Sequence, residues 1–167
     1  MNKLASLALA GFAALGSLAS VPAPALAGAA LDAIKQRGTL RCGVQASPVP
    51  GFAVPNAQGV WTGFNTDICR AIAITIFDDP ARVTFVPVTT QSRFPALASG
   101  EADVLVNNST WTLTRDSAVN RFNFPAIVFV DGQSMMVPRR LNITDARQLD
   151  GASVCIQPGT TTEMNIT

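Results

Sequence analysis

Histidine is absent from the 167-residue sequence. Without an imidazole the chain cannot form Ser-His-Asp or Cys-His nucleophile pairs, and the common catalytic zinc sites are excluded. The motifs G-x-S-x-G, G-x-G-x-x-G and C-x-x-C and the P-loop signature are also missing. The sequence therefore offers few parts for catalysis, and we expect no catalytic residue, no metal site and no cofactor.

Charged residues are scarce as well. They make up 14% of the chain, against 48% hydrophobic residues, and the formal net charge is +1. Arg139–Arg140 is the only adjacent basic pair. Because a nucleic-acid partner usually requires a basic stripe, this composition indicates a globular protein that binds neither DNA nor RNA.

Only three cysteines are present, Cys42, Cys69 and Cys155. The odd number allows one disulfide with a free thiol, or no disulfide at all. Each cysteine has apolar neighbours, which favours buried and inert thiols, although the pairing stays open.

The first 27 residues are typical of a secretory signal peptide. Lys3 gives a short positive region, residues 4–19 are apolar, and Ala25 and Ala27 form the A-x-A pattern that signal peptidase recognises. The alternative is a membrane anchor, but the apolar run is short and two glycines interrupt it. We expect cleavage after about Ala27, which leaves about 140 residues without a transmembrane segment, enough for one ordinary domain.

The remaining chain alternates between strand and helix patterns. Strands are expected at 39–44, 59–64, 81–88, 102–106, 126–130, 133–137 and 152–157. Helices are expected at 31–38, 65–77, 92–100, 144–150 and from 158 onward, with Thr144 and then Thr160 or Thr161 as caps of the last two. The β-α-β-α-β order between 39 and 106 predicts an α/β fold with a parallel, doubly wound sheet.

The clearest helix pattern lies at 65–77. Asn65 or Thr66 can cap its start, and Asp67 suits the positive end of the helix dipole. The i, i+3, i+4, i+7, i+8 spacing predicts one buried face, made of Ile68, Ala71, Ile72, Thr75 and Ile76. We expect this face to pack on the sheet.

Two polar clusters follow expected strands, at 107–115 and at 159–162. Ligands of open α/β sheets gather at the carboxyl ends of the strands, so both clusters are candidate binding segments. Arg115 can present two parallel donors to a carboxylate. The helix start after Gly159 offers backbone N–H groups that also suit a carboxylate.

The polar side chains beside Arg115 extend this interpretation. The hydroxyls of Thr110 and Thr112 and the amides of Asn107 and Asn108 could hold the rest of a small polar ligand, such as an amino acid. The alternatives are that the threonines only cap a turn and that Arg115 is a solvated surface charge. Trp111 is interpreted as a core residue or surface anchor rather than as a stacking platform.

Five segments occur in the order and spacing of a known family. They are GVWTGFNTDICRAIA (59–73), RFPALASGEADVL (93–105), NNSTWTLTRD (107–116), RFNFP (121–125) and LDGASVCIQPGTTTE (149–163). The chain resembles the periplasmic amino-acid-binding proteins of ABC importers, solute-binding protein family 3, and most closely the general L-amino-acid-binding subgroup. The resemblance covers nearly all of the chain after the signal peptide.

The resemblance implies a type II periplasmic-binding-protein-like α/β fold, in which two lobes close over one amino acid. The implied domains are the signal peptide at 1–27, a first lobe with an open parallel sheet at 28–130, and the start of a second lobe at 131–167. The implied ligand-binding residues are Asn107, Asn108, Thr110, Arg115, Gly159, Thr160, Thr161 and Thr162. Arg115 matches the arginine that clamps the ligand carboxylate. Phe52 lies near an aromatic-bearing loop of the family.

The family's second lobe continues beyond the matching region, and the chain then returns to complete the first lobe. The acidic residue that holds the ligand ammonium belongs to that later stretch, so the sequence looks like a fragment. We expect such a fragment to bind amino acids weakly or not at all, because a buried ammonium without a partner costs several kcal/mol. The implied location is the periplasm and the implied partner is a membrane permease.

Two other hypotheses remain at this stage. Some dehydratases and cell-wall lyases resemble these receptors, so a periplasmic enzyme on the same fold is the first alternative. Its general acid or base would come from Glu101, Asp103 or Glu163, although nothing pairs with Asp103 by spacing. The second alternative is a truncated, non-functional remnant.

Overall fold

The computed structural model describes residues 26–117 and 122–166. The predicted signal peptide lies outside these residues except for its last two positions, where helix α1 (Leu26–Arg37) begins. This helix was expected only from residue 31 and starts earlier because its first turns are rich in alanine, the strongest helix former. Over the described ranges, no helix has the length and apolarity needed to cross a membrane.

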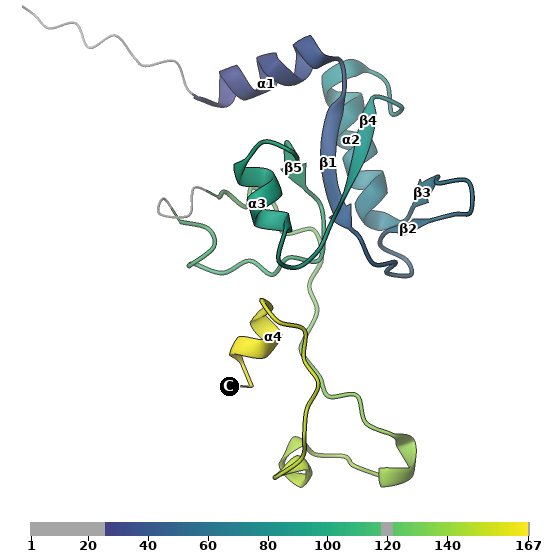
Figure 1. Ribbon diagram of the computed structural model, residues 1–167, viewed down its shortest axis with the longest axis vertical. Coiled ribbons are helices and arrows are strands. Elements are labelled where there is room, and N and C mark those ends of the chain that lie inside the picture. The colour runs from purple at the N-terminus through teal and green to yellow at the C-terminus, as the bar shows by residue number, and fades with distance from the viewer. Residues whose placement is uncertain (1–25, 118–121, 167) are drawn as a thin grey trace, which may run out of the picture.

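A parallel three-stranded sheet forms the centre of the fold, as the sequence predicts (Figure 1). Its strands are β4 (Val83–Val88), β1 (Leu40–Gln45) and β5 (Val104–Leu105), in that order. The register places Cys42 opposite both Phe85 and Val104. The strand β5 is shorter than the expected 102–106, because only two of its residues pair with β1.

Helix α2 (Phe64–Phe77) connects this sheet to a small hairpin. The hairpin pairs β2 (Val54–Pro55), which the sequence analysis missed, with β3 (Trp61–Thr62). The expected caps of α2 are wrong: Gly63 holds the N-cap position without a side-chain bond, and the Thr66 hydroxyl donates to the Gly63 carbonyl at 2.7 Å. Both predicted cap residues lie inside the helix and are buried.

The buried face of α2 agrees with the prediction in part: Ile68, Ile72 and Ile76 pack against the core as expected, but the face is rotated away from the other two positions. Ala71 and Thr75 are exposed, whereas Cys69 and Ala73 are completely buried. The physical reason is a disulfide between Cys42 on β1 and Cys69 on α2, with a Cα–Cα distance of 6.0 Å. This bond turns the row that contains residues 69 and 73 toward the sheet. The expectation of inert thiols is therefore wrong for this pair, and it is also wrong for Cys155, which is free and exposed.

The carboxyl-terminal part of the chain carries little regular structure. Helix α3 (Arg93–Ala98) forms as expected. Among the described residues after β5, the regular elements are the 3₁₀ helices η1 (Arg139–Leu141) and η2 (Ala146–Leu149) and helix α4 (Thr161–Met164). Segments 126–130, 133–137 and 152–157, expected to be strands, form no backbone strand pairing with any described residue. A strand needs a neighbour for its backbone hydrogen bonds, so apolar alternation alone does not produce one.

The segment from residue 131 onward extends away from the sheet (Figure 1). Within the described ranges no residue beyond Val106 is buried, so the core consists of β1, α2 and their neighbours. The cap of η2 is Asp145 rather than Thr144, because the Asp145 carboxylate accepts the backbone N–H of Arg147 at 2.9 Å. Thr160 caps α4 as predicted, since its hydroxyl accepts the N–H of Glu163 at 3.2 Å.

Candidate functional site

Two segments far apart in the sequence meet below the carboxyl ends of β4 and β5. The first, 107–116, leaves the sheet directly after β5, and the second is the turn at 159–162 that opens α4 (Figure 1). The hydroxyls of Thr110 and Thr161 lie 3.1 Å apart and join the two segments. The sequence-predicted clusters are thus brought together.

Arg115 lies at the centre of this contact. Its Nη1 donates to the carbonyl of Thr110 at 2.8 Å, and its Nη2 reaches the carbonyl of Gly159 at 3.5 Å. Its backbone N–H donates to the hydroxyl of Thr112 at 3.2 Å, which fixes the turn. Partial burial lowers the pKa of the guanidinium because desolvation disfavours the charged form.

The turn at 159–162 is held mainly by its own side chains. Gly159 has a φ of +77°, a left-handed conformation that favours glycine. Its N–H donates to Glu163 Oε2 at 2.8 Å. The expectation that this N–H is available to a ligand is therefore wrong. The Thr160 hydroxyl donates to the Gln157 carbonyl at 2.7 Å, and Thr162 is half-buried beside it.

The two asparagines are attached to the first part of the fold. Asn108 Oδ1 accepts from Asn65 Nδ2 at 2.9 Å, and the Asn108 N–H donates to Gln45 Oε1 at 3.0 Å. Asn107 Oδ1 accepts from the Ser109 hydroxyl at 2.5 Å. These bonds connect the segment after β5 to β1 and to the first turn of α2, which positions Thr110 and Arg115.

Arg93 is a member of the site that the sequence analysis missed. Its side chain is 4% exposed, and its Nη2 reaches the carbonyl of Gly159 at 3.4 Å, the same oxygen that Arg115 faces. Among the described residues its Nε is buried without a hydrogen-bond partner. Desolvation and, second, the positive charge of Arg115 lower the pKa of Arg93 to about 10.

Phe94 lies between the two cations. Its ring centroid is 5.0 Å from the Arg93 guanidinium carbon and 5.4 Å from that of Arg115, and it stacks on Phe122 at 5.0 Å. The negative faces of aromatic rings attract cations, so Phe94 offsets part of the repulsion between the two arginines. A signal for Arg93 was available in the sequence, because it follows the carboxyl end of the 81–88 strand just as Arg115 follows that of 102–106.

Two guanidinium groups therefore point at one neutral oxygen. Within the part of the chain that the structure describes, neither arginine forms an ion pair. A carboxylate carries a full negative charge and can accept two parallel bonds from one guanidinium, whereas a carbonyl is neutral. The arrangement is suited to an anion, and a carboxylate could replace the Gly159 carbonyl as the acceptor.

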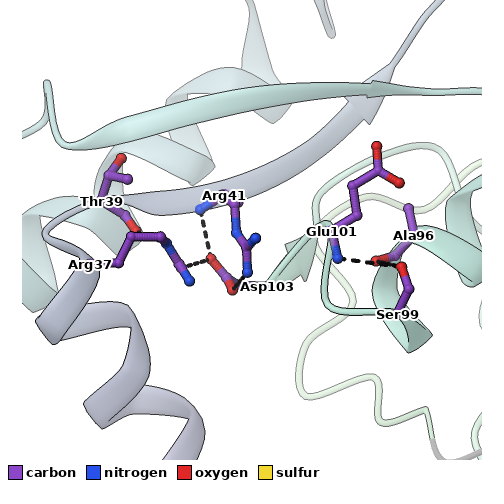
Figure 2. A network of polar contacts seen from close by, with 7 residues as sticks. All are labelled: Arg37, Thr39, Arg41, Ala96, Ser99, Glu101 and Asp103. Carbon is purple, nitrogen blue, oxygen red and sulfur yellow. Dashed lines mark hydrogen bonds and ion pairs between the residues drawn. The ribbon is translucent and has the colours of Figure 1, made fainter.

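The carboxylate Asp103, considered above as an acid or base, lies outside this site. It accepts from Nη2 of Arg37, and it accepts from the backbone N–H of Arg41 at 2.8 Å and from Nη2 of Arg41 at 3.1 Å (Figure 2). This cluster lies where β1 and β5 begin, whereas the site lies where they end. Sequence spacing indicated no partner for Asp103, because Arg37 and Arg41 approach it from sequence-distant elements.

The aromatic residues near the site are placed as follows. Trp111 is 42% exposed and its Nε1 donates to Asp116 at 2.8 Å, so it anchors the surface of the turn and is not a core residue. Phe52 packs edge-to-face on Phe64 at 6.1 Å and on Phe129 at 5.0 Å. The ligand-binding roles given above to Arg115 and its neighbours stay predictions.

Comparison with known proteins places this geometry in a family. Residues 40–160 match the family model of the bacterial extracellular solute-binding proteins, family 3. The chain belongs to this family. The matched range includes the parallel sheet, Arg93 and the segment around Arg115.

Curated members of the family include amino-acid-binding proteins. The glutamate/glutamine/aspartate/asparagine-binding protein BztA of Rhodobacter capsulatus is 47% identical over 150 residues, which are 90% of this chain and 44% of that protein. The general L-amino acid-binding periplasmic protein AapJ of Rhizobium johnstonii is 45% identical over 165 residues, 99% of this chain and 46% of that protein. This chain therefore spans less than half the length of either relative.

A solved structure confirms the fold class. The ABC transporter periplasmic binding protein from Brucella ovis with glutathione bound is 47% identical, with a TM-score of 0.77 over 81% of this chain and 42% of that one. Together with the family match, this establishes the type II periplasmic-binding-protein-like fold. The relatives are binding proteins rather than enzymes, and one of them is named as periplasmic.

Proposed function

We propose that this chain serves in an extracytoplasmic solute-binding component of an ABC importer, which captures L-amino acids in the periplasm and delivers them to a membrane permease. The observation that carries the proposal is the convergence of Arg93 and Arg115 on the single carbonyl oxygen of Gly159. The names of the curated relatives support the same class of ligand.

The ligand's α-carboxylate would take the place of the Gly159 carbonyl beside Arg115. The guanidinium can donate two parallel hydrogen bonds to it, while the hydroxyls of Thr110 and Thr161, already 3.1 Å apart, can donate two more. Asn107 and Asn108 border the same space, and Thr160 and Thr162 complete the turn. The resemblance to the family supports these roles at the matching positions.

Arg93 extends the proposal to the ligand's side chain. A second buried guanidinium close to the first suits a ligand with a second negative or carbonyl oxygen, as in glutamate, aspartate and their amides. BztA, one of the relatives, is named as a binding protein for those four amino acids. We therefore infer that acidic amino acids bind more tightly than apolar ones.

The 167 residues supply only part of the expected binding surface. We propose that 28–130 belongs to the first lobe and that 131–167 begins the second, so that closure over the ligand involves more polypeptide than these residues. An ammonium group without an acidic partner costs several kcal/mol if it is buried. The chain alone should thus bind amino acids far more weakly than a complete receptor.

A role as an enzyme is not proposed. Asp103 is engaged by two arginines at the opposite end of the sheet, and Glu163 accepts the N–H of Gly159. A general acid or base must reach the substrate proton, and Asp103 does not meet that geometric requirement.

NMR titration of the arginine Nε–Hε signals tests the proposal at the affinities expected. A binding free energy of about −4 kcal/mol corresponds to a dissociation constant of about 1 mM. L-Glutamate at about 10 mM should therefore shift the Arg115 signal in a saturable way. Arg82→Lys is the control variant, because Arg82 forms an ion pair with Asp79 and lies away from the site. An unshifted Arg115 signal contradicts the proposal, and micromolar or tighter binding by calorimetry contradicts the expected weakness.

A further inference from the structure

Four hydrogen bonds join the first part of the fold to the turn at 157–161. Two of them are the long bonds from Arg93 and Arg115 to the Gly159 carbonyl, and the third joins Thr110 to Thr161. The fourth is shorter than these: Gln157 Nε2 donates to the hydroxyl of Thr90 at 2.5 Å, across 67 positions of sequence. This bond lies outside the group of residues assigned above to the ligand.

Thr90 lies in a hydrogen-bonded turn directly after the carboxyl end of β4. The turn that contains it is closed by its neighbours, since the Thr89 N–H donates to the Ser92 hydroxyl at 2.9 Å and the Ser92 N–H donates to the Thr89 hydroxyl at 3.1 Å. Helix α3 starts directly afterwards with Arg93. Any group bound to Thr90 is thereby placed in a fixed relation to the Arg93 guanidinium.

Thr90 contacts the opposite turn through both of its branches. Its hydroxyl accepts from Gln157, and its methyl group lies 3.6 Å from the point where a Cβ on Gly159 would stand. Gln157 also accepts the Thr160 hydroxyl on its backbone carbonyl at 2.7 Å, so its position is coupled to the turn that carries Gly159. The Thr90 side chain therefore contacts the turn at two positions, Gln157 and Gly159.

We propose that Thr90 and Gln157 are positioning residues that keep the 157–161 turn docked on the first lobe in the absence of ligand, with the Gly159 carbonyl over the two arginines. Their bond is made between protein groups, so it acts before a ligand arrives. The carbonyl then gives the two guanidiniums a partial negative charge until a carboxylate displaces it. This device goes beyond amino-acid capture and would exist even in a chain that binds no amino acid.

The distance between the two segments in ligand-free protein tests the proposal. Cys155 is free, exposed and two residues before Gln157, and Ala98→Cys provides a second exposed site on α3, so both can carry spin labels while Cys42 and Cys69 stay bonded. Double electron–electron resonance then reports the separation. The doubly labelled parent should give one narrow distance population.

Thr90→Val and Gln157→Leu should each move part of that population to longer distances, because each removes one member of the bond. Loss of one hydrogen bond should change the ratio of docked to undocked molecules about fivefold. The double variant should lose no more than either single variant, since both remove the same bond. Thr90→Ser, which keeps the hydroxyl, should restore most of the docked population.

Thr39→Val is the matched control. The Thr39 hydroxyl lies directly before β1 and 3.3 Å from the hydroxyl of Thr84 on β4, at the opposite end of the sheet from the turn. This variant should leave the distance distribution unchanged. A broad distribution in the parent, or a Thr90→Val distribution identical to the parent's, would overturn the proposal. Because no ligand is present, neither result depends on whether the chain binds amino acids.

Discussion

Arg93 is a buried cation whose charge is poorly compensated. It is 4% exposed, its Nε has no partner among the described residues, and its nearest charged neighbour in the site is another arginine. Burial without an opposite charge destabilises a fold, so such a residue is expected where function requires it. At the scale of single residues, this uncompensated charge supports the proposed anion-binding role of the site.

Replacing Arg93 by methionine should therefore raise the free energy of unfolding by about 1–3 kcal/mol at pH 7. The pKa of Arg93 in the folded chain, about 10, lies below its unfolded value, so the unfolded state binds more protons above that pH. The destabilisation of the folded state by the Arg93 charge is fully present below pH 10, and it declines as the pH rises through 10. Urea unfolding at pH 7 and pH 11 should thus give a smaller difference between variant and parent at the higher pH. Arg82→Met, at an exposed site, should not show this pattern.

Arg115→Lys should weaken glutamate binding about 10- to 100-fold, although the positive charge is kept. Lysine cannot reproduce the two parallel donors of a guanidinium, and hydrogen bonds to charged groups contribute about 1.5–3 kcal/mol. The NMR titration described above measures this affinity through the Arg93 Nε–Hε signal, because Arg93 faces the same Gly159 oxygen and the variant has no Arg115 signal. Equal affinity in Arg115→Lys and the parent would show that this guanidinium does not clamp the carboxylate.

At the scale of elements, α2 is joined to the sheet at two points. The disulfide fixes its second turn to β1, and Gly63 lets its start approach the loop before β2. A Cβ on Gly63 would lie 2.5 Å from the Phe52 carbonyl oxygen, and its φ is +119°. Both features depend on close backbone approach rather than on apolar area.

The disulfide closes a loop across 27 positions, and its removal should cost about 3–4 kcal/mol of stability by the loop-entropy relation. Cys42→Ala/Cys69→Ala measured by urea unfolding checks the value. Cys155→Ala is the control, because that thiol is free and exposed and should contribute almost nothing. Unchanged stability in the double variant would contradict the bond.

Gly63→Ala should destabilise the fold more than Gly59→Ala does. Both positions have positive φ, but nothing lies within 4 Å of a Cβ at Gly59, whereas the Phe52 backbone blocks one at Gly63. We expect about 1 kcal/mol for Gly59→Ala from conformational strain and more than about 2 kcal/mol for Gly63→Ala. Thermal unfolding followed by circular dichroism compares the pair, and equal losses would argue against the close approach.

At the scale of the whole molecule, stability is concentrated in the first part of the chain. All fully buried residues among those described lie between Leu40 and Val106. The segment beyond is largely exposed. It meets the first part through a few hydrogen bonds and ring contacts, among them those of Asn108, Phe129 and Gln157. Regions with few buried contacts open at low free-energy cost.

Trypsin should therefore cut first at Arg139–Arg140, which lies in η1 and is exposed, and leave the sheet and α2 intact. Mass spectrometry of a timed digestion should show a protected fragment that contains the Cys42–Cys69 disulfide. Early cleavage at Arg41, which precedes a buried strand residue, would contradict this distribution of stability.

The sequence alone predicted the parts of this protein that depend on local pattern. The parallel β-α-β-α-β order, the strand at 81–88, helix α3 and the Thr160 cap are confirmed because periodicity and capping act within a few residues. The juxtaposition of Arg115 with the turn at Gly159 was also predicted, but the strand at 152–157 on which that prediction relied does not form.

Only the tertiary structure decided the features that depend on contacts between distant residues. The Cys42–Cys69 bond rotated the face of α2, and Arg37 and Arg41 removed Asp103 from the candidate site. The extended segments from 126 to 157 formed no strands because no described neighbour pairs with them. Arg93 joined the site through its distance to Gly159, and neither periodicity nor composition encodes a distance across 66 positions.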